Sequence, residues 1–150
     1  LGLCSVDDLF ARFLRLGAWP ATRHLQVPIR MADGRADGPG ESRGRWLFRT
    51  AGIPAPVLQY EVWDAAGRQV GTCDWGWPEL GLLGEFDGRL KYGRLLQPGQ
   101  EPGEVVFAEK CREDEKREGT GHSMVRIIWT DYDRPRVTAQ RVRGLMRRPV

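Results

Sequence analysis

The chain has 150 residues and a formal net charge of +3, with 41% apolar and 29% charged residues. These values are typical of one globular domain and exclude a disordered or fibrous segment. No apolar run is long enough to cross a bilayer and no signal-peptide pattern is present, so we expect no membrane partner. Cys4, Cys73 and Cys111 are far apart and lack zinc-binding spacing, which favours a reducing cytoplasm.

The positive charge is nearly all arginine, with lysine only at Lys91, Lys110 and Lys116. The arginine fork binds phosphate oxygens in pairs, which favours nucleic acid as a partner. A GC-rich genome explains the same excess equally well, and a net charge of this size gives only weak attraction.

The first part of the chain predicts one short helix over residues 5–17. Ser5 can cap it, and its apolar positions form a stripe at helical spacing, typical of core or a docking face. Turn-forming residues 33–40 mark a boundary. We therefore expect residues 1–32 to be a helical or linker segment, part of a longer chain because Leu1 replaces a starting Met, and residues 33–150 to be the main domain.

The main domain predicts a helix, three antiparallel strands, a helix, a strand and a last helix that begins at Pro135. Trp46 and Val137 are expected to face inward on the first and last of these helices, and Trp63 to join the apolar face of the strands. The fold class is α/β (α+β), a mixed sheet flanked by helices. The expected ranges are 40–51, 57–63, 68–76, 80–87, 104–118, 125–129 and 135–148.

Residues 72–91 contain the acidic side chains that suggest chemistry. A turn at Pro78 pairs the second and third strands so that Asp74 lies about opposite Glu85. Alternation places Glu85 and Asp87 on one face, so three carboxylates converge. Such like charges repel unless a cation or a proton is present, and hard oxygen ligands suit Mg²⁺. The alternative is that Asp87 and Gly88 form a turn with solvated acids.

The order of elements matches the αβββαβ core of the restriction-endonuclease-like, PD-(D/E)XK superfamily. The sequence words ESRGR, EFDGRLKYG and EKCRED resemble actinobacterial proteins related to very-short-patch-repair endonucleases. Such proteins often carry an N-terminal segment like that of AbiEi-type antitoxins of type IV toxin–antitoxin systems. The resemblance covers about residues 30–147.

The resemblance implies that Asp74 and Glu85 hold Mg²⁺, with Mn²⁺ as the alternative. Asp87 stands where a lysine usually orients the attacking water, so the resemblance leaves Lys91 or Lys110 for that role. It also implies that Glu41 completes the metal shell and that Gln59 points toward the site. We thus expect Asp74, Glu85 and Asp87 as metal ligands, and Glu41, Lys91 and Lys110 as further catalytic residues.

Two functions from different classes follow from these residues. The first is a Mg²⁺-dependent endonuclease that hydrolyses phosphodiester bonds of DNA, with arginines on the outer helices holding the backbone. The second is a non-catalytic DNA- or partner-binding module of an AbiEi-like regulator, with a toxin as its partner. Metal binding distinguishes the two.

Overall fold

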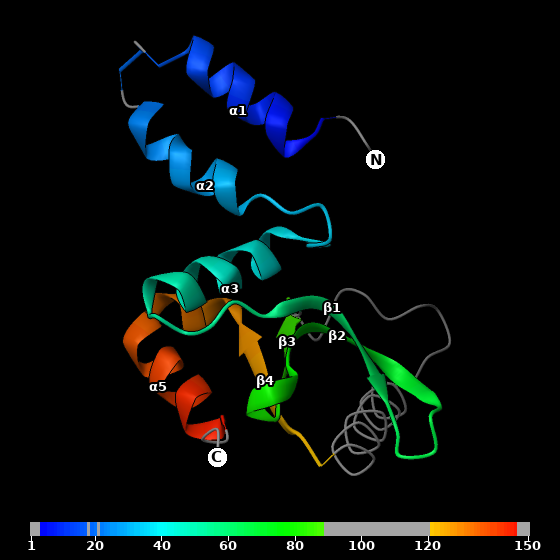
Figure 1. Cartoon of the computed structure of the whole chain (residues 1–150). Coiled ribbons are helices and arrows are strands. Elements are labelled where there is room, and N and C mark those ends of the chain that lie inside the picture. Colours follow the sequence, from blue (N-terminus) through cyan, green and yellow to red (C-terminus); the bar gives the residue numbers. More distant parts are fainter. Residues whose placement is uncertain (1–3, 18, 21, 89–120, 147–150) are drawn as a thin grey trace, which may run out of the picture. The chain divides into compact units, whose positions relative to one another are not determined.

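A computed structural model describes residues 4–17, 19–20, 22–88 and 121–146 (Figure 1). The chain divides into two compact units, Leu1–Arg35 and Ala36–Val150, and each is described by itself. The expected boundary lay after residue 32. The helix expected at 104–118, together with Lys91 and Lys110, lies outside the described residues.

The first unit contains α1 (Val6–Arg15), a short 3-10 turn η1 (Thr22–Leu25) and α2 (Gln26–Met31). Ser5 caps α1 as predicted: its hydroxyl accepts from the Asp8 amide at 3.1 Å, and the Asp8 carboxylate accepts from the Ser5 amide at 2.9 Å. No residue of α1 is buried, so its apolar stripe forms no closed core within this unit. The sequence pattern missed α2, in which Pro28 occupies the first turn, where no amide donor is needed.

The second unit is built on a four-stranded mixed sheet in the order β1-β2-β3-β4. The strands are β1 (Val57–Trp63), β2 (Gln69–Trp77), β3 (Leu82–Asp87) and β4 (Ser123–Ile128). β1, β2 and β3 form the predicted antiparallel meander, and β4 pairs in parallel with β3. The turn between β2 and β3 is η2 (Pro78–Leu80), closed by Gly81 in the left-handed region.

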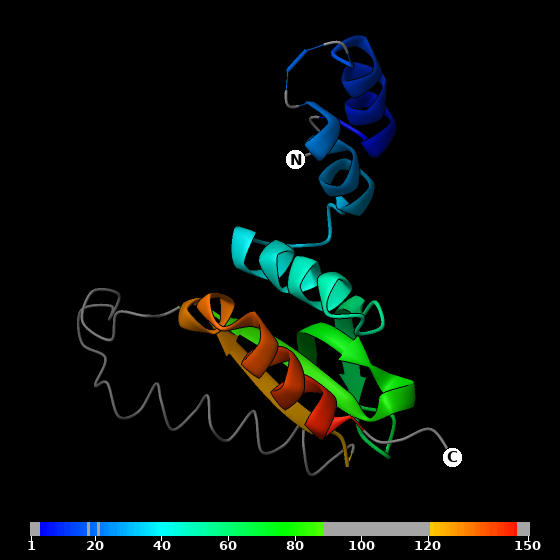
Figure 2. The same ribbon diagram turned by 90° about the vertical axis from the view of Figure 1, so that its left-hand side faces the viewer.

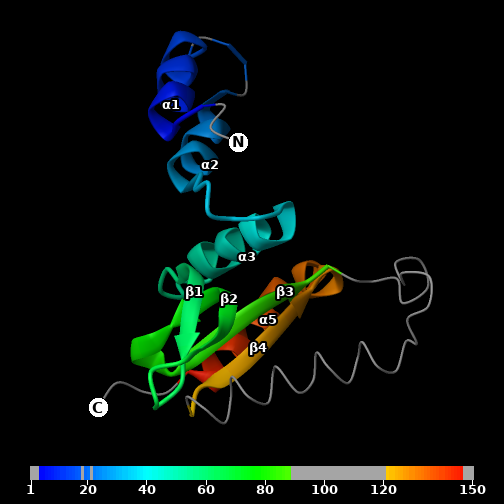
Figure 3. The same ribbon diagram turned by 90° about the vertical axis from the view of Figure 1, so that its right-hand side faces the viewer.

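Two helices, α3 (Pro39–Thr50) and α5 (Pro135–Leu145), cover one face of this sheet. Figure 2 shows α5 in front of the strands, and Figure 3, from the opposite side, shows the strands in front of α5. The core between helices and sheet consists mainly of apolar side chains. Its most buried members are Phe48, Trp75, Leu82, Ile127 and Val142.

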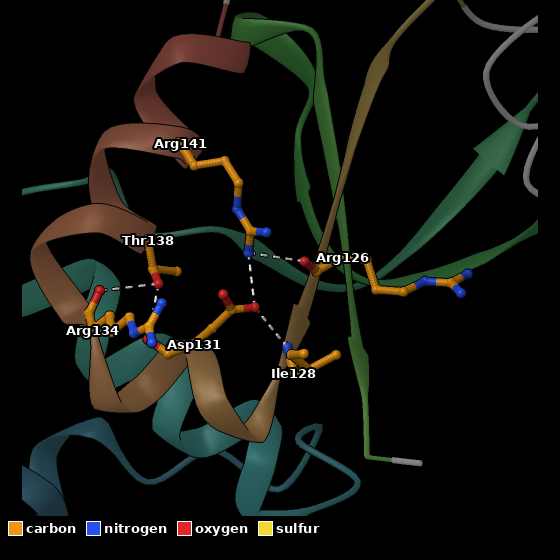
Figure 4. A network of polar contacts seen from close by, with 6 residues as sticks. All are labelled: Arg126, Ile128, Asp131, Arg134, Thr138 and Arg141. Carbon is orange, nitrogen blue, oxygen red and sulfur yellow. Dashed lines mark hydrogen bonds and ion pairs between the residues drawn. The ribbon is translucent and has the colours of Figure 1, made fainter. Parts of the chain in front are cut away.

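A polar network fastens α5 to the end of β4 (Figure 4). The Asp131 carboxylate, in the 3-10 turn η3 (Trp129–Asp133), accepts from the Ile128 amide at 3.0 Å and from the Arg141 guanidinium at 2.8 Å. Arg141 also donates to the Arg126 carbonyl at 3.1 Å. The Thr138 hydroxyl donates to the Asp131 carbonyl at 2.8 Å. The start of α5 and the end of β4 are therefore held as one piece.

For three residues, the prediction that the side chain faces the core is wrong. Trp46 is 46% exposed, Trp63 is 50% exposed and Val137 is 63% exposed. On α3 and α5 the buried stripe is displaced, because Leu47 and Phe48, and then Thr138, Ala139 and Val142, meet the sheet. Trp63 lies at the end of edge strand β1, beside a register shift, where little packs against it. Trp75 and Trp77, on β2, are buried.

Among the described helices, none is both long and apolar enough to cross a membrane.

Candidate functional site

The two central strands separate soon after they leave their shared turn. β2 pairs with β3 only at Trp75↔Gly84, Gly76↔Leu83 and Trp77↔Leu82. Beyond that point β2 continues beside β1, and β3 continues beside β4 to Asp87. Asp74 and Glu85 are the next residues in register, so they stand where the strands diverge.

Asp74 bridges this divergence with its side chain. Its Oδ2 accepts a hydrogen bond from the backbone amide of Phe86 at 2.7 Å. The Asp74 carboxylate is therefore the acceptor for the backbone amide of the residue that follows Glu85 on β3. The neighbouring Cys73 thiol lies 3.9 Å from Glu85 Oε1. Asp74 therefore reaches the backbone of β3, whereas the Cys73 thiol is the side chain of β2 that lies beside the Glu85 carboxylate.

Glu85 and Asp87 lie on one face of β3 and share Arg126 of β4. Arg126 stands directly beside Glu85 in the parallel ladder. Its guanidinium nitrogens lie 3.8 Å from Glu85 Oε2 and 3.7 Å from Asp87 Oδ2. These distances are those of ion pairs without a direct hydrogen bond. A cation from the chain itself thus offsets part of the repulsion between the two acids.

Glu41 lies in the first turn of α3 and is only 8% exposed. Its Oε2 accepts from the Asp37 amide at 3.0 Å and from the Gln59 side-chain amide at 3.3 Å. Burial raises the pKa of Glu41, and the negative charges of Asp74 and Asp37 add to that rise. The hydrogen bonds from Asp37 and Gln59 favour the charged form and oppose the shift. Glu41 and Asp74 are therefore close enough to interact electrostatically.

An aromatic group borders the acids at the end of β3. Phe86 packs edge-on against Trp129, with ring centroids 4.9 Å apart, and stacks near Tyr132 at 5.8 Å. The guanidinium of Arg43 lies 5.0 Å from the centroid of the Tyr132 ring. Burial raises the pKa of Tyr132, whose hydroxyl donates to the Gly40 carbonyl at 2.6 Å. This group fixes the start of α3, and with it Glu41, against β3.

The structure brings the predicted acids together only in part. Asp74 is near Glu41, and Glu85 is near Asp87, but the described residues hold no group of three or more His, Cys, Asp or Glu side chains placed to bind a metal ion. The donor chemistry fits Mg²⁺, since all four side chains offer carboxylate oxygens. Lys91 and Lys110 fall outside the described residues, so their expected role stays a prediction.

Sequence reasoning missed Arg126 and the Arg43–Tyr132 contact. Arg126 becomes a neighbour of Glu85 only through the parallel pairing of β3 and β4, which a hydrophobic pattern does not specify. Arg43 is an exposed residue of α3. Its position over Tyr132 joins residues far apart in the chain, and no local sequence signal reports such a contact.

Comparison with known proteins gives one short similarity. Proteins described as uncharacterized in two strains of Mycobacterium tuberculosis are 36% identical over 56 residues, which cover 37% of this chain and 20% of each relative. The similarity thus spans a fifth of the curated relatives' length. A scan of protein families found no match, and no solved structure matches.

Proposed function

We propose that the chain is a Mg²⁺-dependent endonuclease that hydrolyses phosphodiester bonds of DNA. The observation that carries the proposal is the divergence of β2 and β3, with Asp74 at the split, Glu85 next in register and Glu41 coupled to Asp74 from α3. Asp74 and Glu41 interact at this split, and Glu85 is the neighbouring acid on β3. Burial of the Glu41 carboxylate costs stability, which favours a functional role for this acid over a purely structural one.

The proposal assigns Asp74, Glu85 and Asp87 as ligands of Mg²⁺ or Mn²⁺, with Glu41 completing the shell. When bound, such an ion lowers the pKa of a water molecule and offsets charge on the phosphate. Lys91 or Lys110 is assigned to orient the water. Exposed arginines of α3 and α5 hold the DNA backbone, and the cytoplasmic location expected from the sequence gives access to DNA.

A plasmid-cleavage assay tests the assignment of Asp74. Asp74→Asn keeps an oxygen for the Phe86 amide, so the fold is retained while the charge is lost. We expect Mg²⁺ to support nicking by the wild-type chain, EDTA to stop it, and Asp74→Asn to reduce it at least a hundredfold, on the order of lost metal-assisted catalysis.

Asp64→Asn is the matched control. Asp64 lies in the β1–β2 turn, where its Oδ1 accepts from the Ala66 and Arg68 amides, and asparagine keeps this acceptor. Cleavage by this variant should equal that of the wild-type chain. Equal cleavage by Asp74→Asn and the wild-type chain would remove Asp74 from the mechanism.

The ion pairs of Arg126 favour a second candidate function. Because Arg126 already contacts Glu85 and Asp87, the acids are partly neutralised without a metal ion. The same fold could then serve as a non-catalytic DNA- or toxin-binding module of an AbiEi-like regulator. Calorimetry with millimolar Mn²⁺ separates the two functions, since absence of binding to the wild-type chain, together with retention of DNA, supports the module.

A further inference from the structure

Gln59 has a backbone conformation that its side chain disfavours. Its φ is +49°, and it is the one non-glycine residue with positive φ in the described part of the chain. The other described positions with positive φ are glycines, such as Gly52, Gly67 and Gly81. A β-carbon makes the left-handed conformation costly, so the structure around Gln59 must stabilise it.

The strained residue coincides with a break in the ladder between β1 and β2. Leu58 pairs with Trp75 and Tyr60 pairs with Cys73, while the step between them, which would join Gln59 to Asp74, is missing from the pairing. The break therefore lies opposite Asp74, at the level where β2 also leaves β3.

The break also changes which face the strands present. In a regular strand Leu58, Tyr60 and Val62 would all point to one side. Instead, Leu58 packs in the core under α3 and α5, whereas Tyr60 and Val62 pack with Leu83 in a second apolar cluster. β2 shows the same change between Trp75 and Cys73. Both strands turn at one level, where the Gln59 amide reaches Glu41 Oε2 at 3.3 Å.

We infer that Gln59 is a positioning residue, whose strained backbone places its side-chain amide on Glu41 and opens the ladder at Asp74, so that the two carboxylates serve one divalent cation. The inference rests on the proposed function, because that cation is the shared ligand. The amide occupies Glu41 Oε2 together with the Asp37 amide. Those two donors fix the orientation of the carboxylate.

The test compares Mn²⁺ affinity, measured by calorimetry, with thermal stability. Gln59→Gly relieves the strain and removes the amide. Gln59→Asn tolerates the same φ but has a shorter side chain that does not reach Glu41. We expect both variants to bind Mn²⁺ at least about tenfold more weakly, as for other residues that orient metal ligands. Both should keep the melting temperature within a few degrees of the wild-type value.

Two further variants make the result specific. In a Glu41→Gln background, Gln59→Gly should cause no additional loss of affinity, because the residue acts through Glu41. Gln69→Gly is the matched control: Gln69 is an exposed glutamine of β2 at the far end of the same hairpin, where it pairs with Trp63. This variant should bind Mn²⁺ like the wild-type chain.

Each outcome decides one of the two proposals. Unchanged affinity in Gln59→Gly, or an equal loss in the Glu41→Gln background, would overturn the positioning role while the proposed function stands. A wild-type chain without Mn²⁺ affinity would end the proposed function, and the role of Gln59 with it.

Discussion

At the scale of single residues, Glu41 carries the clearest electrostatic signature. Its carboxyl is buried on α3 and faces the charge of Asp74, and both effects raise its pKa. A carboxyl whose pKa rises on folding binds its proton more tightly in the folded chain. It therefore stabilises the folded chain fully below its unfolded-state pKa and loses that contribution as pH rises through the folded-state value.

Glu41→Gln should abolish this pH dependence. The variant keeps an oxygen for the Asp37 and Gln59 amides but has no charge to bury. In EDTA, we expect its free energy of unfolding relative to the wild-type chain to increase as pH rises from the unfolded-state pKa of Glu41 through the folded-state pKa and then to level off, measured by urea titration. Glu61→Gln, at an exposed position of β1, is the control. Parallel curves for wild type and Glu41→Gln would contradict the electrostatic account.

The residue scale also shows what the sequence could predict about the site. The sequence predicted that Asp74 and Glu85 are neighbours in the β2–β3 hairpin. This prediction was possible because the register depends on the alternation of side chains and on one turn, which are local properties. The strain at Gln59 and the ion pairs of Arg126 depend on packing between elements distant in sequence. The periodicity of the sequence predicts neither of these features. The division of the acids into the pairs Asp74–Glu41 and Glu85–Asp87 is therefore visible only in the structure.

At the scale of elements, α3 lies flat on the sheet because two of its residues lack a side chain. A β-carbon at Gly40 would overlap the ring of Phe86, and one at Gly44 would overlap the ring of the fully buried Trp75. These glycines let the helix approach the strands closely, although glycine weakens a helix interior. The close approach brings Glu41, which lies between them, to the sheet.

Gly44→Ala should therefore destabilise the fold by about 1–3 kcal/mol, the usual cost of overpacking a core, despite a gain in helix propensity. Gly144→Ala is the matched control on α5, since a β-carbon there meets nothing within 4 Å. It should stabilise the chain by about 0.5–1 kcal/mol. Chemical denaturation of both variants measures these changes. An equal response of the two would show that α3 does not need its close contact with Trp75.

The sequence predicted most of the helices and strands correctly, but it did not predict which side of each helix faces the core. The capped helix, the meander and the helix opened by Pro135 agree with the sequence pattern, because caps, turns and alternation are local. Trp46 and Val137 were assigned inward because they are large and apolar. The structure instead buries Thr138 and Ala139, which are small enough for close packing under α5.

At the scale of the whole molecule, the proposed binding of DNA depends on the arginines of the helical layer. Arg49 on α3 and Arg136 on α5 are exposed, and both helices cover the same face of the sheet. Each cation that contacts a phosphate releases a counterion, so the logarithm of the binding constant falls with the logarithm of salt concentration by about 0.9 per contact. This salt dependence of DNA binding does not require a metal ion. DNA binding can therefore be measured separately from DNA cleavage.

We expect the double variant Arg49→Gln/Arg136→Gln to bind duplex DNA more weakly in EDTA and to reduce the salt slope by about 2, uniformly across sequences. Fluorescence anisotropy over a range of salt concentrations measures both quantities. Arg68→Gln is the control, because that guanidinium pairs with Asp64 at 2.8 Å in the β1–β2 turn. If the double variant kept the wild-type slope, the helical layer would not contact the phosphates, and DNA would have to approach the acids by another face.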